Sequence, residues 1–285
     1  MMRILGIDAG NHAVKVYGGK GEFAFPSAMG EYRERNLESR YSENDLVYEY
    51  KGQKGFAGTL ALHESEFAIS RTGASKAHAE LPIRVLLALH RYGGGDDFRI
   101  VVGQPIKKHN PPEKAKIKKL LEGRHQIVVN GVLRDFLIDR VEVAPEGAAA
   151  FWSAPRNGKV RILDFGSGTV NAATLINGGY NDRDSFTLEY GLETIQTDDP
   201  AAMVRHTAIQ ALKRWKEYDP VYVCGGGAEA AMTPLRDYFE TVLPLAPRVA
   251  DGQGGFRQLS PVYANAVGFY MVASKAFGGG GRGAV

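Results

Sequence analysis

A strand–turn–strand pattern stands out in the middle of the chain, over residues 161–176, which read RILDFGSGTVNAATLI. The apolar pair Ile162–Leu163 opens the pattern, and the β-branched and small residues of Val170–Ile176 close it. The polar segment DFGSGT, residues 164–169, lies between them. Two apolar runs joined by a short glycine-containing segment are typical of two strands and a tight turn.

The turn of this hairpin has the residue types of an anion site. Gly166 and Gly168 lack a Cβ atom, so backbone N–H groups can converge there on an anion. Asp164, just before the turn, is the kind of carboxylate that holds a hydrated cation beside such an anion. Glycine-rich hairpins are common, however, so on this stretch alone an ordinary turn is the stronger interpretation.

The same pattern occurs near the N-terminus, over residues 3–17, RILGIDAGNHAVKVY. A strand over 4–7, a turn and a second strand over 13–17 are predicted. Asp8–Gly10 and Asp164–Gly166 share the pattern Asp-x-Gly and lie 156 positions apart. Two such hairpins with matching apolar flanks, about half a chain apart, indicate an internal duplication on the scale of a domain.

Further elements are predicted between the two hairpins. The region 22–58 holds an alternating segment up to Pro26 and a hairpin over Gly52, and it reads as a small insertion on a larger domain. Two helices are predicted, each with a proline in its first turn and a glycine beyond its end, over 80–91 and 112–121. The remaining strands predicted before the second hairpin cover 98–102, 125–129, 132–138 and 140–143.

A short helix rich in small residues is predicted after the last of these strands, where residues 145–151 read PEGAAAF. Small side chains would let this helix pack tightly against another one. Glu146 lies in its first turn, where a carboxylate can simply stabilise the helix dipole. That interpretation and a functional one are both open at this point.

The second half of the chain alternates strands and helices. Gly225–Gly227 separates a strand from the helix after it, so a flat ligand could lie against bare backbone there. Close packing of helix on strand is the alternative. The chain beyond Gly278 is glycine-rich and is expected to be mobile. The predicted strands cover 186–191 and 220–224, and the predicted helices cover 199–217, 228–238 and 261–277.

Composition adds bounds to this picture. The chain has 285 residues, 44% apolar and 24% charged, which suits two domains or one large two-lobed domain. A net charge of only +3 gives no reason to expect direct nucleic-acid binding. The single cysteine, Cys224, lies in an apolar run, which excludes an intrachain disulfide and a cysteine-based metal site and fits a reducing cytosol. No signal-peptide pattern or apolar run of about 18 residues is seen, so a cytoplasmic protein without a membrane span is expected.

The order of these features resembles that of the ATPase superfamily that joins actin, the heat-shock chaperones and the sugar kinases. Five elements in the right order cover most of the chain. A Walker A sequence and a G-x-G-x-x-G after a strand are both lacking, which disfavours the commoner nucleotide folds. The corresponding stretches are the first phosphate loop (Asp8–Lys15), first connecting helix (Glu146–Phe151), second phosphate loop (Asp164–Thr169), adenosine loop (Gly225–Gly227) and second connecting helix (Asn265–Met271).

Within this superfamily the chain is similar to the ParM-type bacterial plasmid-segregation actins. Gln104 departs from their pattern, because a leucine is more usual in the Gly-x-Pro stretch that it occupies. The similarity rests on four stretches that are less specific than the phosphate loops, namely Phe25–Ser27, Phe56–Ala61, Val101–Ile106 and Tyr263–Phe269.

The resemblance implies an α/β fold of two lobes, with a duplicated core of mixed β-sheet and helices and a nucleotide cleft between the lobes. Thr169 and Gly225 are only 56 positions apart. This spacing leaves little room for the subdomain IIB that the family inserts here. We therefore expect this subdomain to be reduced or absent, as in the short AlfA-type segregation actins.

The expected division of the chain follows from the same resemblance. Lobe I would also carry a small insertion, subdomain IB. The expected ranges are 1–143 and 260–278 for lobe I, about 30–70 for subdomain IB, 144–259 for lobe II and 279–285 for a flexible tail.

The resemblance also implies an ATP site with Mg²⁺. The catalytic residues would be Glu146, Asp8 and Asp164. Glu146 would orient or deprotonate the attacking water, and Asp8 and Asp164 would hold Mg²⁺ mainly through water. Lys15 would contact the phosphates. The glycines that would face the adenosine are Gly225, Gly226 and Gly227. The backbone N–H groups expected to bind phosphates belong to Gly10, Asn11, Gly166, Ser167, Gly168 and Thr169.

The implied function is ATP-dependent polymerisation into filaments that segregate plasmid DNA, with ATP hydrolysis driving filament turnover. The expected partners are further copies of the chain, joined head to tail in a multi-stranded filament, and a DNA-binding adaptor at a centromere-like plasmid site. Neither DNA nor a membrane would be bound directly. The competing class is a small-molecule kinase of the same superfamily, acting on a sugar or an acid. Such kinases usually carry larger insertions, and this chain is short between its motifs.

Overall fold

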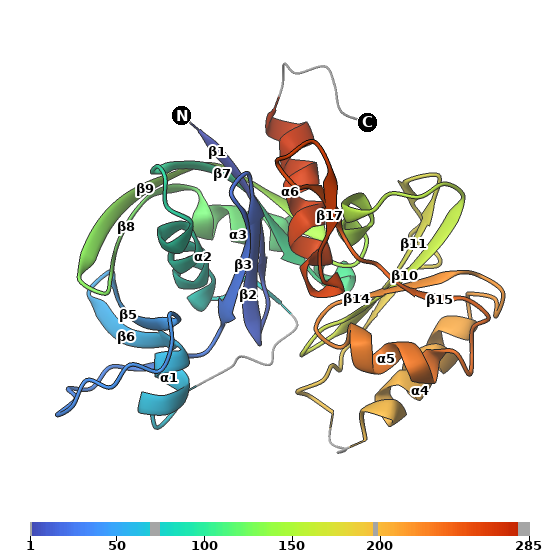
Figure 1. Cartoon of the computed structure of the whole chain (residues 1–285), viewed down its shortest axis with the longest axis horizontal. Helices are drawn as coiled ribbons and strands as arrows, with labels where there is room; N and C mark the ends of the chain where they lie inside the picture. Colours follow the sequence, from blue (N-terminus) through green and yellow to red (C-terminus); the bar gives the residue numbers. More distant parts are fainter. Residues whose placement is uncertain (1, 69–74, 196–198, 279–285) are drawn as a thin grey trace.

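Two β-sheets lie on either side of the helix α6 (Ala264–Phe277), which runs through the centre of the molecule (Figure 1). The computed structural model describes residues 2–68, 75–195 and 199–278. The expected tail, 279–285, lies outside the described residues. The chain therefore has a mixed α/β fold with two lobes.

The larger sheet has the strand order β3-β2-β1-β7-β9-β8-β5-β6-β4. Most of its strands carry alternating or continuous buried residues, as expected for strands packed on a core. In chain order the strands are β1 (Arg3–Ala9), β2 (Ala13–Gly18), β3 (Gly21–Pro26), β4 (Met29–Glu31), β5 (Asp45–Tyr50), β6 (Gln53–Gly58), β7 (Asp97–Gln104), β8 (Gly123–Val129) and β9 (Val132–Pro145).

The smaller sheet has the order β12-β11-β10-β14-β15, with β13 paired to β11 beside it. Its central strands, β10 and β14, are buried along nearly their whole length. The strands are β10 (Lys159–Phe165), β11 (Val170–Ile176), β12 (Gly179–Tyr180), β13 (Phe186–Leu188), β14 (Val221–Cys224) and β15 (Val242–Pro244).

The two sheets share one topology, which confirms the predicted duplication. In the series β3-β2-β1-β7-β9 the first two pairings are antiparallel and the last two are parallel. The series β12-β11-β10-β14-β15 repeats this order of pairings. The register repeats as well, because Asp8 lies opposite Lys15 and Asp164 lies opposite Asn171, each pair spanning one hairpin.

The helices cover the sheets, and two of the described α-helices, α3 (Pro111–Leu121) and α4 (Pro200–Leu212), have a side-chain cap at the N-terminus. Asn110 accepts a hydrogen bond from the N–H of Glu113 at the start of α3, and Asp199 accepts one from Ala201 at the start of α4. The remaining α-helices are α1 (Thr59–Glu64), α2 (Glu80–Tyr92), α3 (Pro111–Leu121), α4 (Pro200–Leu212) and α5 (Ala228–Leu235). Three 3₁₀ helices are η1 (Ile106–Lys108), η2 (Ala149–Ser153) and η3 (Pro261–Tyr263).

The helix predicted over 145–151 is wrong in type and in start. Pro145 ends β9, and the N–H of Glu146 still donates to the carbonyl of Gln104 in the neighbouring strand β7, at 2.9 Å. Gly147 then has φ of +72°, a conformation that an α-helix cannot include. The chain therefore turns over residues 146–148, and only the 3₁₀ helix η2 follows.

The helix predicted over 199–217 is also too long. It ends at Leu212, because residues 213–219 fold into turns. In these turns the Asp219 carboxylate accepts the N–H of Lys216 at 3.1 Å while it also binds the buried guanidinium of Arg161. A long-range ion pair thus sets a helix end that local apolar spacing cannot reveal.

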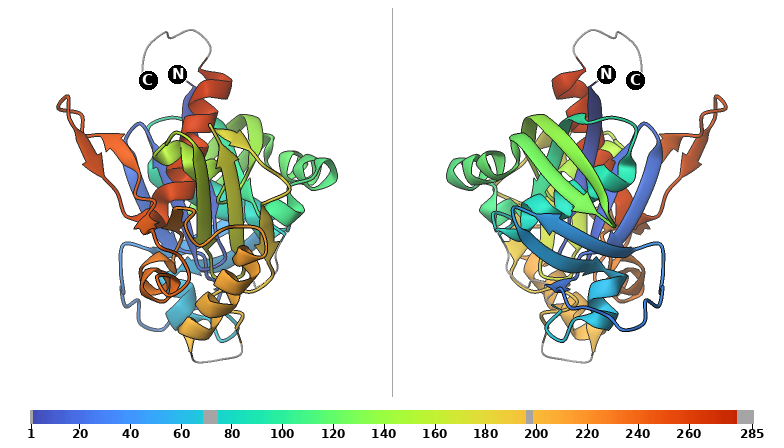
Figure 2. Two further views of the ribbon diagram at one scale, coloured as in Figure 1. Left: turned by 90° about the vertical axis from the view of Figure 1, so that its right-hand side faces the viewer. Right: turned by 90° about the vertical axis from the view of Figure 1, so that its left-hand side faces the viewer.

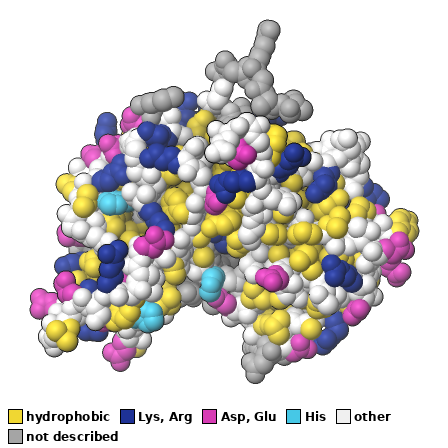
Figure 3. Space-filling view, viewed as in Figure 1, with side chains coloured by type: hydrophobic (Ala, Val, Ile, Leu, Met, Phe, Trp, Pro, Cys, Tyr) yellow, Lys and Arg dark blue, Asp and Glu magenta, His cyan; other side chains and the backbone are white. Residues whose placement is uncertain are grey.

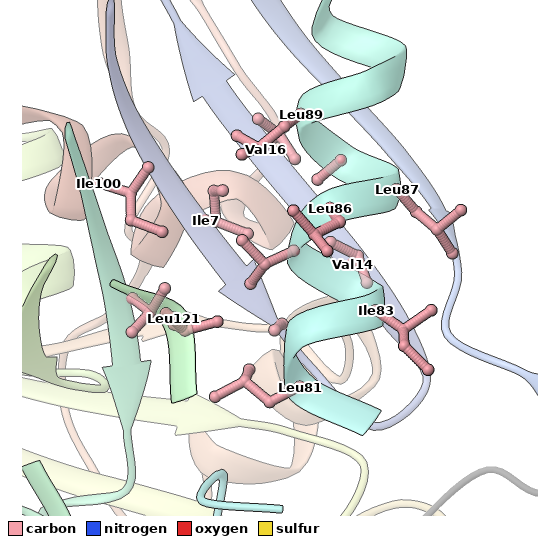
Figure 4. Packing of buried hydrophobic residues seen from close by; sticks show 14 of the residues in the cluster. Ile7, Val14, Val16, Leu81, Ile83, Leu86, Leu87, Leu89, Ile100 and Leu121 are labelled. Carbon is pink, nitrogen blue, oxygen red and sulfur yellow. The ribbon is translucent and has the colours of Figure 1, made fainter. Parts of the chain in front are cut away.

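The larger sheet forms its core with α2. The apolar residues of this helix face β1, β2 and β7, as Figure 4 shows for Leu86, Ile7, Val14 and Ile100. Leu121, from the end of α3, completes the same cluster. This packing holds the β1–β2 hairpin between a helix and its neighbouring strands.

Helix α6 joins the two lobes through very close backbone contact. A Cβ atom on Gly268 would lie 2.0 Å from the carbonyl oxygen of Ala149 in η2. A Cβ atom on Gly6 would lie 2.1 Å from the carbonyl oxygen of Ala266. The central helix thus touches β1 on one side and η2 on the other, and glycine is required at both contacts.

The region between β11 and β14 is short. In its described part, it holds β12, β13 and α4 but no additional subdomain. The corresponding region of the larger lobe, between β2 and β7, also contains β4, β5, β6 and α1. The expectation that subdomain IIB is reduced or absent is thus confirmed for the described residues.

One hairpin projects from the body of the molecule in both views of Figure 2. It consists of β16 (Arg248–Ala250) and β17 (Phe256–Gln258), which pair with each other and with neither sheet. The side chain of Arg257 forms an ion pair with Glu22 of β3, which ties the hairpin to the larger sheet. No described helix is long and apolar enough to cross a membrane.

Replacing Gly268 by alanine tests the contact between α6 and η2. Alanine would normally favour a helix by about 1 kcal/mol over glycine. Here we expect the free energy of unfolding to fall by about 1–3 kcal/mol or more, because the added methyl group overlaps the Ala149 carbonyl. Urea denaturation followed by circular dichroism measures this change.

The matched control is Gly19→Ala. A Cβ atom there would approach only the Tyr92 hydroxyl, at 4.0 Å. We expect that variant to unfold at the wild-type urea concentration. Equal stabilities for the two variants would contradict the close contact described at Gly268.

Candidate functional site

A cavity of about 280 Å³ lies where the two duplicated hairpins face each other. Figure 3 shows the hollow between the two halves of the molecule. The cavity brings together residues that are far apart in the sequence. Those of the predicted site residues that line it are Asp8, Gly10, Asn11, Lys15, Glu146, Asp164, Gly166, Ser167, Gly168, Thr169, Gly225 and Gly226.

Buried charges dominate this cavity. Three carboxylates line it, from Asp8, Glu146 and Asp164, together with the ammonium groups of Lys15 and Lys76. Four of the five residues are more than nine-tenths buried, and the Lys15 side chain is 13% exposed. Charges are costly to bury unless they are paired, so this arrangement needs partners for each group.

Each carboxylate has a defined partner. Lys15 Nζ lies 3.2 Å from Asp8 Oδ2, and the two residues face each other across the β1–β2 hairpin. Asn265 of α6 donates its Nδ2 proton to Asp164 Oδ2 at 2.9 Å. Lys76 Nζ lies 3.7 Å from Glu146 Oε1.

The first phosphate loop is supported from behind at one atom. The carbonyl oxygen of Gly10 accepts a hydrogen bond from Ser27 Oγ at 2.6 Å and one from Arg84 Nη1 at 3.3 Å. The N–H of Ser27 also donates to the carbonyl of His12 at 2.9 Å. Ser27 follows β3 and Arg84 comes from α2, so the loop is tied both to the segment after β3 and to this helix.

The second phosphate loop is supported by a segment that sequence reasoning did not single out. The N–H groups of Leu192 and Glu193 donate to the carbonyls of Gly166 and Ser167, at 3.1 and 2.8 Å. The N–H of Gly166 itself donates to the carbonyl of Thr169 at 2.9 Å. The expectation that this N–H donates to a phosphate therefore does not fit the structure, because the turn already uses it.

A side-chain contact joins the two loops across the cavity. A hydrogen bond links His12 Nδ1, in the first loop, to Glu193 Oε1, in the segment behind the second loop. Both residues line the cavity. The His12 side chain is 74% exposed, so this contact lies at the solvent side of the site.

The glycine triplet has three different roles. Gly225 has φ of +88°, and a Cβ atom there would lie 2.6 Å from Asp164 Oδ1, so glycine allows β14 to end against this carboxylate. Gly226 has no atom within 4 Å of an added Cβ and is open to the cavity. Gly227 does not line the cavity. Its N–H donates to the carbonyl of Phe165 at 3.0 Å, and α5 begins after it.

Glu146 is an acid of the site whose pKa is strongly raised. Burial raises the pKa of its carboxyl from 4.5 to about 7. The Lys76 ammonium opposes this rise, and the carboxylates of Asp8 and Asp164 add to it. A carboxyl with a pKa near neutrality can accept or give up a proton at physiological pH, which suits a general base.

The pKa values of two further charged groups of the cavity, Asp164 and Lys15, are also shifted. Burial raises the pKa of Asp164, and the hydrogen bond from Asn265 limits that rise. Burial alone would lower the pKa of Lys15, but the adjacent Asp8 carboxylate outweighs this and raises it. Lys15 is therefore a permanent cation in the cavity.

Three polar residues that contact the carboxylates of the cavity were not predicted as site residues. Asn171 donates to Glu146 Oε2 at 3.3 Å. The duplication could have identified this residue, because it lies 156 positions after Lys15, the same offset that separates the two Asp-x-Gly turns. Asn265 lies in a stretch that carried the family resemblance, without a role of its own. Lys76 gave no signal, because it lies in a polar segment without apolar periodicity.

The donor set suits Mg²⁺ held mainly through water. No cluster of three or more histidine, cysteine, aspartate or glutamate side chains suited to a metal occurs in the described ranges. Mg²⁺ usually keeps several waters and binds one or two carboxylates together with substrate phosphates. Asp8 and Asp164 supply such a pair of carboxylates on opposite hairpins of one cavity.

The sequence model described as the N-terminal domain of actin-like proteins matches residues 6–148, which is half of the chain. This chain belongs to the actin-like proteins. The match covers the first phosphate loop, Lys76 and the turn that carries Glu146. A search of curated proteins finds no match.

Solved structures support the same fold over almost the whole chain. An AlfA filament bound to AMPPNP has a TM-score of 0.74 at 24% identity, with 98% of each chain covered. The AlfA filament of the B. subtilis plasmid pLS32 has a TM-score of 0.74 at 23% identity, covering 93% of this chain and 97% of that one. The crystal structure of apo pSK41 ParM has a TM-score of 0.69 at 17% identity, covering 96% and 98%.

The raised pKa of Glu146 predicts a pH-dependent stability for this actin-like protein. The folded state holds a proton on Glu146 up to about pH 7, whereas the unfolded chain loses it near pH 4.5. The folded state thus binds more protons between these values, so stability falls as pH rises through this window. Thermal unfolding without nucleotide, measured at intervals from about pH 5 to 7.5, should show this decline.

Glu146→Gln provides the comparison, because the amide stays neutral at every pH. We expect its melting temperature to decline less than that of the wild type over the same range. Parallel curves for the two proteins would show that Glu146 ionises near its ordinary pKa.

Proposed function

We propose that this actin-like protein binds ATP in the cavity between its two hairpins, hydrolyses it, and uses this cycle to form and dissolve filaments in plasmid DNA segregation. The observation that carries the proposal is the cavity itself. Two duplicated Asp-x-Gly loops, three buried carboxylates and two lysines converge there. Phosphoryl transfer depends mostly on positioned charge, which is what this arrangement offers.

The phosphates would lie between the two loops. Lys15 would turn its ammonium group from Asp8 toward the phosphates, a short movement because both line the cavity. Backbone N–H groups of Gly10 and Asn11 on one side, and of Ser167, Gly168 and Thr169 on the other, would donate to phosphate oxygens. Gly225 and Gly226 would leave room for the adenosine.

Glu146 would act on the attacking water. Its Oε2 accepts from Asn171, while Oε1 accepts no hydrogen bond from any described residue. That oxygen is therefore available for a water proton, and the pKa of about 7 lets the carboxylate take it up.

Asp8 and Asp164 are the residues that would hold Mg²⁺. The bound ion would supply positive charge to the phosphates. The second hydrogen bond of Asn265, to the N–H of Gly147 at 2.9 Å, would keep Asp164 and the turn of Glu146 in fixed relation while nucleotide binds.

Nucleotide binding would favour a closed arrangement of the lobes. The two loops belong to different sheets, so a ligand that contacts both holds the sheets together. We propose the division into lobe I (1–143 and 260–278, with the insertion at about 30–70) and lobe II (144–259). A change in lobe closure alters the surface that each subunit offers to the next.

Filament formation is supported by the likeness in fold to AlfA filaments over nearly the whole chain. Subunits that join head to tail without closing a ring form an open filament. With a net charge of +3, we propose that plasmid DNA is reached through a DNA-binding adaptor at a centromere-like site, in the cytoplasm, without direct DNA or membrane binding.

Glu146→Ala tests the catalytic assignment. We expect the variant to bind AMPPNP as tightly as the wild type and to release phosphate from ATP about 10²- to 10⁴-fold more slowly, since a positioned base contributes that much. Phosphate release and fluorescence-detected nucleotide binding measure the two quantities. Glu142→Ala is the control, because Glu142 pairs with Lys118 outside the cavity. Unchanged phosphate release by Glu146→Ala would rule the assignment out.

Light scattering after addition of Mg-ATP tests the filament. We expect a sharp rise in scattering above a critical protein concentration, a slow decline as ATP is consumed, and filaments in electron micrographs. Mg-ADP should give a higher critical concentration. A protein that never scatters, and that consumes ATP only when a sugar or an organic acid is added, would instead be a small-molecule kinase.

A further inference from the structure

Lys76 is a buried cation of the cavity to which the proposed mechanism gives no role. It precedes α2, and its side chain is 9% exposed. A buried lysine loses its hydration and side-chain freedom, so it persists only where a partner compensates. Its described ionic partner is Glu146, with Nζ 3.7 Å from Oε1.

The backbone of Lys76 is anchored by a chain of hydrogen bonds. Its N–H donates to Gln104 Oε1 at 2.8 Å, and Gln104 is fully buried at the end of β7. Gln104 Nε2 donates in turn to Glu113 Oε2 at 3.3 Å, and Ser75 Oγ donates to the same oxygen at 2.6 Å. The start of α3 thus holds the segment 75–76 in place.

Among the described residues, only one side chain donates a hydrogen bond to the Glu146 carboxylate, and it does so at Oε2. Asn171 donates to its Oε2, and the N–H of Glu146 is bonded to the Gln104 carbonyl. Gln104 therefore joins the backbones of both Lys76 and Glu146, through its side chain and its main chain respectively. The contact of Lys76 with Oε1 completes the positioning of the carboxylate.

The charge balance assigns the two lysines different tasks. Lys15 lies against Asp8 on the first loop, at 3.2 Å, and Lys76 lies against Glu146, beyond direct hydrogen-bond distance at 3.7 Å. At that separation the Lys76 ammonium attracts the carboxylate electrostatically without occupying Oε1 with a direct hydrogen bond. Lys76 can therefore orient the Glu146 carboxylate while Oε1 stays available to a water.

We propose that Lys76 is a positioning residue for ATP hydrolysis, which acts by holding the Glu146 carboxylate toward the attacking water. The inference rests on the proposed function, since it concerns the same site. The proposal also explains the role of Gln104, because its side chain holds the backbone N–H of Lys76 in place.

Lys76→Met tests the proposal, since methionine keeps the apolar stem and removes the charge. We expect kcat for ATP to fall by about 10- to 100-fold, as for a catalytic group displaced by about 1 Å. The affinity for AMPPNP should stay within about threefold of wild type, because Lys76 acts through Glu146 and not on the phosphates. Lys76→Arg should recover part of the lost kcat.

The decisive measurement is a double-mutant cycle with Glu146→Ala. If Lys76 acts through Glu146, Lys76→Met causes no further loss of kcat once Glu146 is absent. Additive losses, or a loss of AMPPNP affinity as large as the loss of kcat, would overturn the proposal, since Lys76 would then act on the nucleotide itself. Unchanged kcat in Lys76→Met would overturn it too.

Two controls separate this proposal from folding and from the proposed function. Lys118→Met removes a lysine that pairs with Glu142 outside the cavity, and its kcat should equal that of wild type. Should Lys76→Met not fold, Lys76→Gln removes the charge but keeps a polar end, and the same outcomes apply. A wild-type protein that does not hydrolyse ATP contradicts the proposed function, whereas normal wild-type hydrolysis with normal Lys76→Met hydrolysis contradicts only the role of Lys76.

Discussion

The geometry of the site depends on two hydrogen bonds made by the side-chain amide of Asn265. Its Nδ2 donates to Asp164 at the end of β10, and its Oδ1 accepts the N–H of Gly147, next to Glu146. One residue of α6 therefore sets the relation between the second hairpin and the turn that carries the proposed base. It can do so because α6 lies in backbone contact with η2 at Gly268, where any side chain would collide. The packing of α6 against η2 thus determines how the carboxylates of Asp164 and Glu146 are placed relative to each other.

That alignment gathers charges that would repel one another without compensation. Three carboxylates share the cavity with two ammonium groups. The binding of a polyanion and its cation would therefore change the balance of positive and negative charge in the site. The raised pKa of Glu146, about 7, follows from this crowding of charge, because burial and the two neighbouring carboxylates favour the protonated form of its carboxyl group. The Lys76 ammonium counteracts this effect, because its positive charge favours the ionised form of Glu146. The position of Lys76 depends in turn on the buried side-chain amide of Gln104, and a leucine at this position could not accept the same hydrogen bond.

The duplicated hairpins were predictable because their signals are local. Each combines apolar strands with an Asp-x-Gly turn, and β-pairing across a tight turn needs only neighbouring residues. The same holds for α2 and α3, whose apolar periodicity, first-turn prolines and following glycines are local signals. Short strands such as β4 and β15 went unpredicted, because three residues carry no periodicity and pair only with distant partners. The predicted helix at 145–151 failed for a related reason, since Gly147 and a bond to Gln104 in β7 override local propensity.

The sequence by itself determined the two-lobed actin-like fold, the loss of room between Thr169 and Gly225, and most of the residues that line the cavity. These follow from the order and spacing of motifs along one chain. Only the tertiary structure decided which charges meet. The pairing of Lys76 with Glu146 joins residues 70 positions apart, and burial sets the pKa of the acid. Electrostatic energies depend on distance and desolvation in the folded state, and neither quantity is written in local sequence.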